Sequence, residues 1–110
     1  MLTENQKKWV DALRSGDYKQ AKGRLECHGS YCCLGVACLV AEQHGVPVRR
    51  EGMSLYGGRL WDQKPVKECI GFLDENAILI TANDRDGWSF SEIADLIESN
   101  PPGLFVEVTK

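Results

Sequence analysis

The side chains best suited to covalent or metal chemistry are five cysteines and two histidines. Four of the thiols are close in sequence, with a histidine beside the first: Cys27, His28, Cys32, Cys33 and Cys38. Structural zinc sites use cysteine pairs two to four residues apart, whereas Cys32 and Cys33 are adjacent and point in different directions. Because free cysteine is among the most buried residue types, we expect reduced core thiols, no metal ligands and no cofactor.

A nucleophilic cysteine is the alternative use of these thiols. Cys32 and Cys33 are predicted to lie at a helix N-terminus, where the helix dipole favours thiolate. A thiol nucleophile also needs a histidine within hydrogen-bond reach. His44 lies at the far end of the same predicted helix, about 15 Å away by helical rise, which leaves His28. The sequence therefore keeps open a cysteine-dependent hydrolase or transferase that uses Cys32 or Cys33.

The polar segment from Asn83 to Gly87 is predicted to be a turn between a strand and a capped helix. Ligands gather at such turns because free backbone N–H groups point outwards there. The segment lacks the glycine spacing and the Lys-Ser/Thr end of a P-loop. Aligned with a calcium-binding EF-hand loop, it places Ala82 and Ile93 at ligand positions. Asn and Asp are also ordinary turn residues, so a purely structural turn is the alternative.

Aromatic and basic residues in the middle of the chain form the other half of a candidate site. Exposed aromatic rings beside arginines could stack on a base or anchor a partner protein, and core packing is the alternative use for the rings. No pattern assigns a catalytic residue. The candidate ligand-binding residues are Arg49, Arg50, Tyr56, Arg59 and Trp61, together with Asn83, Asp84, Asp86 and Trp88.

Four helices are predicted to position these residues. Thr3 with Gln6, and Ser89 with Glu92, have the spacing of a capping box at the start of a helix. Residues 33–41 are apolar on all sides, which predicts a buried central helix. Pro65 suits the first turn of a further short helix that runs to Phe72.

Short strands are predicted to complete the fold. Turn residues at 28–30 and the Gly57-Gly58 pair predict two hairpins. Ala77–Thr81 is predicted to be a buried strand, and the alternation of Leu104, Val106 and Val108 predicts a last strand. Residues 24–27 would pair near 31–32 in the first hairpin, and 53–56 with 59–61 in the second. The expectation is a single α+β domain over residues 1–110.

Composition restricts the class of protein. Of 110 residues, 43% are hydrophobic and 26% charged, the proportions of one globular domain. The first fifty residues carry eight Lys and Arg against five Asp and Glu, and the rest carry five against eleven. This asymmetry could mark a binding patch. The net charge of -3 argues against a general nucleic-acid binder.

Cysteine usage and hydropathy predict the location. The longest apolar run, Tyr31–Ala41, is too short to span a bilayer, so no membrane segment is expected. An odd number of cysteines and an N-terminus without a signal-peptide pattern argue against a secreted disulfide scaffold. We therefore expect a cytoplasmic protein, and exposed aromatic residues leave a homodimer open.

The most distinctive segments are Tyr31-Cys32-Cys33-Leu34-Gly35-Val36-Ala37-Cys38, Asn83-Asp84 and Ser89-Phe90-Ser91-Glu92-Ile93-Ala94-Asp95-Leu96-Ile97-Glu98. They resemble a group of small uncharacterised proteins found in tailed-phage and prophage genomes. The pattern Trp9 to Leu13, Ser15-Gly16 and Tyr18 is also similar. Cys69-Ile70-Gly71-Phe72 departs from the group, which often reads Trp-Leu-Gly-Leu there.

The resemblance implies a phage-encoded accessory protein that acts in the host cytoplasm, and it transfers no catalytic role. Small phage accessory proteins often bind and block something, such as a host defence protein, or sequester a nucleotide-like signalling ligand. We therefore expect a non-enzymatic binding protein with a host protein or a small nucleotide-like ligand as its partner. The cysteine-dependent enzyme is the alternative.

Overall fold

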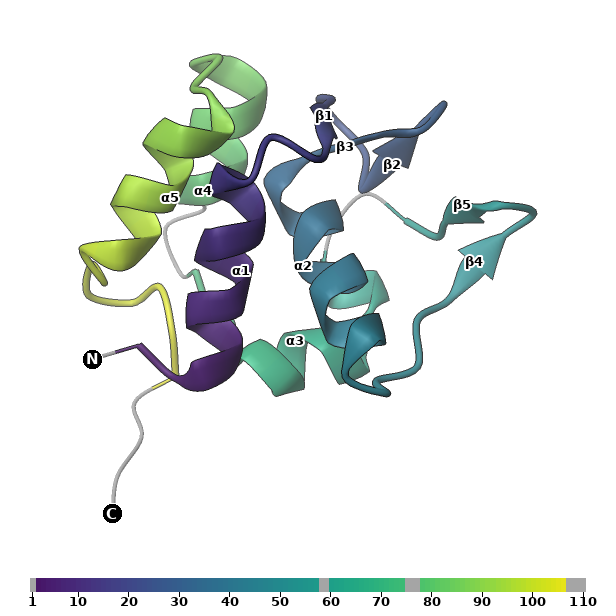
Figure 1. The fold of residues 1–110 in the computed structure, drawn as a ribbon, viewed down its shortest axis with the longest axis horizontal. Helices are drawn as coiled ribbons and strands as arrows, with labels where there is room; N and C mark the ends of the chain where they lie inside the picture. The colour runs from purple at the N-terminus through teal and green to yellow at the C-terminus, as the bar shows by residue number, and fades with distance from the viewer. Residues whose placement is uncertain (1, 58–59, 75–77, 107–110) are drawn as a thin grey trace.

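The computed structural model describes residues 2–57, 60–74 and 78–106, except for the side chain of Trp61, and confirms the α+β class (Figure 1). Its helices are α1 (Glu4–Arg14), α2 (Cys33–Gln43), α3 (Lys64–Ile70), α4 (Ile78–Ile80) and α5 (Phe90–Glu98), with a 3₁₀-helix η1 (Leu60–Asp62) and a π-helix η2 (Thr81–Arg85). Its strands are β1 (Lys19–Gln20), β2 (Glu26–Cys27), β3 (Ser30–Tyr31), β4 (Arg50–Glu51) and β5 (Ser54–Leu55).

The helices form one side of the molecule and the hairpins project from the other (Figure 1). Helix α1 packs between α5 and α2, and α3 also packs against α2. Trp9 of α1 is fully buried at the centre, with its ring edge-on to Phe72 and Phe105 at centroid distances of 6.2 Å. Its Nε1–H donates to the Cys33 carbonyl at 2.9 Å, so the largest core side chain leaves no unpaired polar atom.

Both predicted capping boxes are confirmed. Thr3 and Gln6 exchange side-chain and backbone hydrogen bonds at the start of α1, and Ser89 and Glu92 do the same at the start of α5. These reciprocal bonds satisfy N–H groups that have no partner inside the helix. The interactions lie within four residues of sequence, which is why the sequence alone predicts them.

Helix α2 is the buried central helix that was predicted. Of its eleven residues, eight are buried, including every residue from Cys33 to Cys38. Gly35 is needed because a Cβ there would lie 2.9 Å from the carbonyl carbon of Leu25 and nearer still to its oxygen. The missing side chain lets the segment before β2 lie directly on the helix.

The first hairpin is confirmed, and it gains a third strand. β2 pairs antiparallel with β3 through Glu26–Tyr31 and Cys27–Ser30. His28 and Gly29 form the turn with φ of 50° and 81°, the pair of positive angles that a type I′ turn requires. β1 pairs with the other edge of β3 in parallel, a pairing that the sequence analysis did not predict.

The second hairpin turns at an earlier glycine than the one predicted. β4 pairs with β5 through Arg50–Leu55 and Glu51–Ser54, so the turn is Gly52-Met53 rather than Gly57-Gly58. Gly52 has a φ of 64°, which suits the first position of a two-residue hairpin turn. Of the predicted return strand 59–61, residues 60 and 61 belong to η1, while Gly58 and Arg59 lie outside the described residues.

The strand predicted at Ala77–Thr81 is wrong. Ile78–Ile80 form α4, which continues from Thr81 as the π-helix η2, and Ala77 lies outside the described residues. The Asp74 carboxylate accepts hydrogen bonds from the backbone N–H groups of Ile78 at 2.9 Å and Leu79 at 3.3 Å. It therefore caps the start of a helix, and a short apolar run alone cannot reveal this.

The predicted helix from Pro65 is confirmed as α3, which ends at Gly71 with a left-handed φ of 71°. The predicted last strand reduces to one antiparallel bridge between Phe72 and Phe105. Val106 N–H donates to the Gly71 carbonyl at 2.7 Å beside this bridge. Val108 lies outside the described residues.

Candidate functional site

The two hairpins lie side by side and are tied together at their base. The backbone N–H of Leu25 donates to the carbonyl of Gly57 at 3.3 Å. The backbone N–H of Leu55 donates to Oε1 of Glu26 at 2.9 Å. At the edge of β5 the Glu26 carboxylate is the acceptor, in the place that a backbone carbonyl would take in a sheet. Strands β2 and β5 are therefore linked through a side chain and belong to two separate sheets. We call residues 24–31 and 49–57 the two-hairpin surface.

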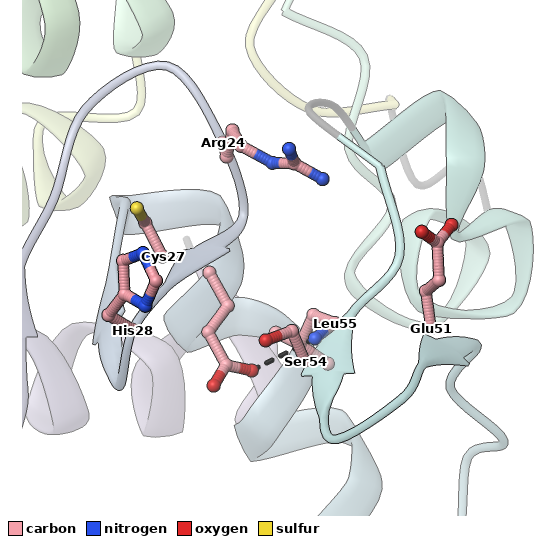
Figure 2. Close-up of a pocket in the computed structure, with 7 residues that line it drawn as sticks. Arg24, Cys27, His28, Glu51, Ser54 and Leu55 are labelled. Carbon is pink, nitrogen blue, oxygen red and sulfur yellow. Dashed lines mark hydrogen bonds between the residues drawn. The ribbon is translucent and has the colours of Figure 1, made fainter.

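A polar cleft opens between the hairpins (Figure 2). Its volume is about 230 Å³. Figure 2 shows Cys27 and His28 on one side, Glu51 on the other, and Arg24 between the hairpins. The lining residues of this inter-hairpin cleft are Arg24, Glu26, Cys27, His28, Glu51, Ser54 and Leu55.

Most polar groups of the cleft are uncommitted. Within the described part of the chain, the side chains of Arg24, His28, Glu51 and Ser54 form no hydrogen bond or ion pair. The cleft therefore presents a cation, a carboxylate, an imidazole and a hydroxyl to solvent above Leu55, which is 1% exposed. Such a set can exchange hydrogen bonds and ion pairs with an incoming ligand without first breaking internal ones.

Gln63 fixes the base of the second hairpin. Its side chain is fully buried, and its Oε1 accepts from the Arg49 backbone N–H at 2.8 Å. Its Nε2 donates to the backbone carbonyls of Arg49 at 2.8 Å and Tyr56 at 3.0 Å. One buried amide therefore makes three hydrogen bonds to the residues on either side of β4 and β5, which holds the hairpin in one orientation.

Arg49 and Tyr56 form a single surface unit above Gln63. The guanidinium carbon of Arg49 lies 4.4 Å from the centre of the Tyr56 ring, a cation–π contact. At the hairpin tip the side chain of Met53 is 93% exposed. It is the most exposed large apolar side chain within residues 2–57, 60–74 and 78–106. Arginine, tyrosine and methionine are enriched at protein–protein interfaces.

The structure does not bring together the two halves of the predicted ligand site. η2 lies beside α5, while β4 and β5 lie at the opposite end of the molecule, beyond α1 and α2 (Figure 1). Asn83 is 1% exposed and wholly engaged: its Nδ2 donates to the Ala21 carbonyl and to Asp84, and its Oδ1 accepts from Gln20 Nε2 at 2.8 Å. It therefore attaches η2 to β1 and is unavailable to a ligand.

The remaining predicted residues have separate environments. Arg50 is committed to an ion pair with Glu42, which lowers the pKa of the Glu42 carboxyl. Asp86 pairs with Arg85 at 3.3 Å on the surface, and Trp88 is 37% exposed. Arg59 and the side chain of Trp61 lie outside the described residues.

The cysteines divide by exposure. Cys32 and Cys33 are buried, and burial raises the pKa of Cys32 to about 11 and that of Cys33 well above its usual 9.0. Neither thiol bonds to His28 in the described structure, so neither has the thiolate or the base that a nucleophile needs. This geometry argues against the cysteine-dependent enzyme. Cys27 is exposed, and it lines the cleft.

Two further negative findings concern the described residues only. No group of three or more His, Cys, Asp and Glu side chains is arranged to hold a metal ion. None of the described helices has the length and apolar character of a membrane-spanning segment.

A second hollow, of about 360 Å³, lies over α1 and α5 and contains none of the predicted site residues. Its lining is Leu2, Lys7, Val10, Asp11 and Glu98.

Residues 1–64 match the model of a family described as a domain of unknown function, DUF8296. The chain belongs to this family. The match contains α1, both hairpins, α2 and η1, and therefore every residue of the inter-hairpin cleft and Gln63. No curated protein and no solved structure matches the chain.

Sequence reasoning selected Arg49, Arg50 and Tyr56 of the two-hairpin surface but missed other residues that form this surface or support it. Arg24, Glu26, Met53 and Gln63 belong to no motif, and Gln63 acts across 14 residues of sequence on Arg49. The one usable signal was Gly52 followed by Met53, a glycine at a turn with a large apolar side chain at the tip. The prediction instead favoured the Gly57-Gly58 pair.

Proposed function

We propose that this chain is a non-enzymatic cytoplasmic binding protein that docks onto a partner protein through the two-hairpin surface. The observation that carries the proposal is an exposed Met53 at the tip of a hairpin whose base is bonded to buried Gln63. Exposed apolar anchors on preorganised elements give affinity because little conformational entropy is lost on binding. The reducing cytoplasm is supported by five free cysteines, of which three are buried.

A partner protein fits this surface better than a nucleotide-like ligand. Pockets for small molecules usually measure about 300–1,000 Å³, and the inter-hairpin cleft measures about 230 Å³. One face of the Tyr56 ring is already covered by Arg49, so that face is not free to stack on a base. Protruding hairpins flanked by Arg, Tyr and Met side chains are suited to a complementary groove on another protein.

The resemblance to phage proteins supports a host factor as the partner, with inhibition of host defence as the outcome. In that setting the protein would act by occupying a surface of the host protein. No catalytic group is required, in keeping with the inert Cys32 and Cys33.

The test compares variants of the immobilised chain in capture from bacterial host lysate, followed by titration of the purified captured protein. Met53→Asp removes the apolar tip, and Val106→Asp, at a side chain that is 52% exposed outside the two-hairpin surface, is the matched control. We expect Met53→Asp to weaken binding at least tenfold and Val106→Asp to leave it within twofold. Equal affinity of wild type and Met53→Asp would refute the assigned surface, and titration with cyclic nucleotides tests the alternative ligand.

A further inference from the structure

We infer that the inter-hairpin cleft binds a segment of the partner protein in which an acidic and a basic side chain are neighbours. This inference rests on the proposed function. The acidic side chain would pair with Arg24, and the basic one with Glu51. The cleft would select this pair of charges, whereas Met53 would supply apolar contact outside the cleft.

Opposite charges enter the cleft from the two facing hairpins. Arg24 lies two residues before the start of β2, and Glu51 belongs to β4. Figure 2 shows the Arg24 guanidinium pointing towards the β4–β5 side of the cleft and the Glu51 carboxylate on that far side. Neither side chain has an ion-pair partner within the described part of the chain. Within the described part of the chain, the cleft therefore carries two unpaired charges of opposite sign.

The other charged groups at the cleft differ from these two. Glu26 also lines the cleft, and its Oε1 accepts the Leu55 N–H. Arg50, the neighbour of Glu51, is already neutralised by Glu42. Arg24 and Glu51 consequently remain the groups with most to gain from a ligand.

This balance disfavours ligands of a single charge. A phosphate or other anion beside Arg24 would also meet the carboxylates of Glu26 and Glu51. A cation beside Glu51 would meet Arg24. A ligand that carries both charges can place each one beside the opposite charge of the cleft, and such charge complementarity is a source of specificity at interfaces.

The size of the cleft agrees with two side-chain ends. A volume of about 230 Å³ is below the range of about 300–1,000 Å³ that is usual for small-molecule pockets. Ser54 and His28 can complete hydrogen bonds at the edges, while Leu55 closes the floor. An intact nucleotide or a helix needs more room than this.

The experiment uses capped dipeptides as probes of the 110-residue chain. Ac-Glu-Lys-NH2 carries both charges, and Ac-Glu-Gln-NH2 and Ac-Gln-Lys-NH2 carry one each. Binding is followed by amide chemical shifts of residues around the cleft in NMR spectra and by protection of the exposed Cys27 thiol from iodoacetamide. We expect dissociation constants on the order of millimolar, with the doubly charged peptide at least threefold tighter than either control.

Variants separate the two ends of the cleft. Arg24→Gln and Glu51→Gln should each weaken Ac-Glu-Lys-NH2 at least threefold, whereas Arg85→Gln, an exposed arginine in η2, should leave it unchanged. Equal affinity for the three peptides, or no shift at the cleft, would overturn the inference. If the peptides fail while Met53→Asp still abolishes partner capture, the cleft inference falls and the proposed function stands.

Discussion

Substitution of Gly35 by alanine tests whether α2 and the two-hairpin surface depend on one close approach. Intrinsic helix propensity alone predicts that Gly35→Ala stabilises the protein by about 1 kcal/mol. The structure predicts the opposite sign, because the new Cβ would lie 2.9 Å from the Leu25 carbonyl carbon and 3.3 Å from Tyr31 Cβ. Because the Leu25 oxygen would lie nearer still, the Leu25 backbone would have to move by roughly 1.5 Å or more to reach ordinary contact distances.

Leu25 has little freedom to make that movement. Its side chain is fully buried, its carbonyl accepts from the Cys32 N–H at 3.3 Å, and its N–H donates to Gly57. Overpacking a core contact costs about 1–3 kcal/mol, and each hydrogen bond that breaks costs about 1 kcal/mol more. After the propensity gain, we expect Gly35→Ala to lower the free energy of unfolding by about 2–3 kcal/mol.

Equilibrium urea unfolding, followed by tryptophan fluorescence and circular dichroism, measures this change. Gln43→Ala, at an exposed position of the same helix, is the control and should stay within about 0.5 kcal/mol of wild type. Hydrogen exchange at the Leu25 and Cys32 amides should accelerate in Gly35→Ala. If Gly35→Ala proves as stable as wild type or more so, α2 does not approach Leu25 as described and the reasoning fails.

Three further predictions concern caps, titration and thiols. Ser89→Ala should lower the free energy of unfolding by about 1 kcal/mol in urea titrations because it removes a capping hydrogen bond; an unchanged midpoint would contradict the cap. Burial raises the pKa of Asp74 above its usual 3.8, so its protonation favours folding at low pH and this contribution is lost as the pH rises through the folded-state pKa. Asp74→Asn should therefore gain stability relative to wild type as the pH rises from the usual pKa of 3.8 through the raised folded-state pKa, and a constant difference would refute this. In native protein, mass spectrometry should find Cys27 alkylated first by iodoacetamide, Cys69 more slowly and the three buried cysteines only after unfolding; early labelling of a buried one would revive the enzyme alternative.

The sequence predicts those parts of the fold that depend on contacts between residues only a few positions apart. Thr3 and Gln6 cap α1 through contacts three residues apart, and the same holds for Ser89 and Glu92. The burial of α2 follows from a run in which every side is apolar, whatever surrounds it. Local chemistry is sufficient in these cases.

The errors arise where distant residues decide between local alternatives. Glycines stand at both possible turns of the second hairpin, and buried Gln63 selects the earlier turn by bonding to Arg49 and Tyr56. Asp74 turns the apolar run at 78–80 into a helix. No such long-range bond is visible in a single sequence.

The candidate site was only partly predictable, for a related reason. Arg49 and Tyr56 were selected for their residue types, and the β4–β5 hairpin, which differs from the predicted one, brings them into contact. Asn83 was selected for its polarity, which the fold uses to attach η2 to β1. Residue type shows what a side chain can do, and the fold determines whether that capacity remains free.

Gln6 shows how one position can be restricted beyond what its helix requires. Its Oε1 accepts from the Thr3 N–H, as glutamate would, but its Nε2 donates to the Ile70 carbonyl at 2.7 Å. A glutamate there would set a carboxylate against that carbonyl inside a buried site, since Gln6 is 4% exposed. Glutamate and glutamine, interchangeable in most alignments at such a position, are therefore unequal here, and homologues that retain the junction of α1 and α3 should be recognised by the amide.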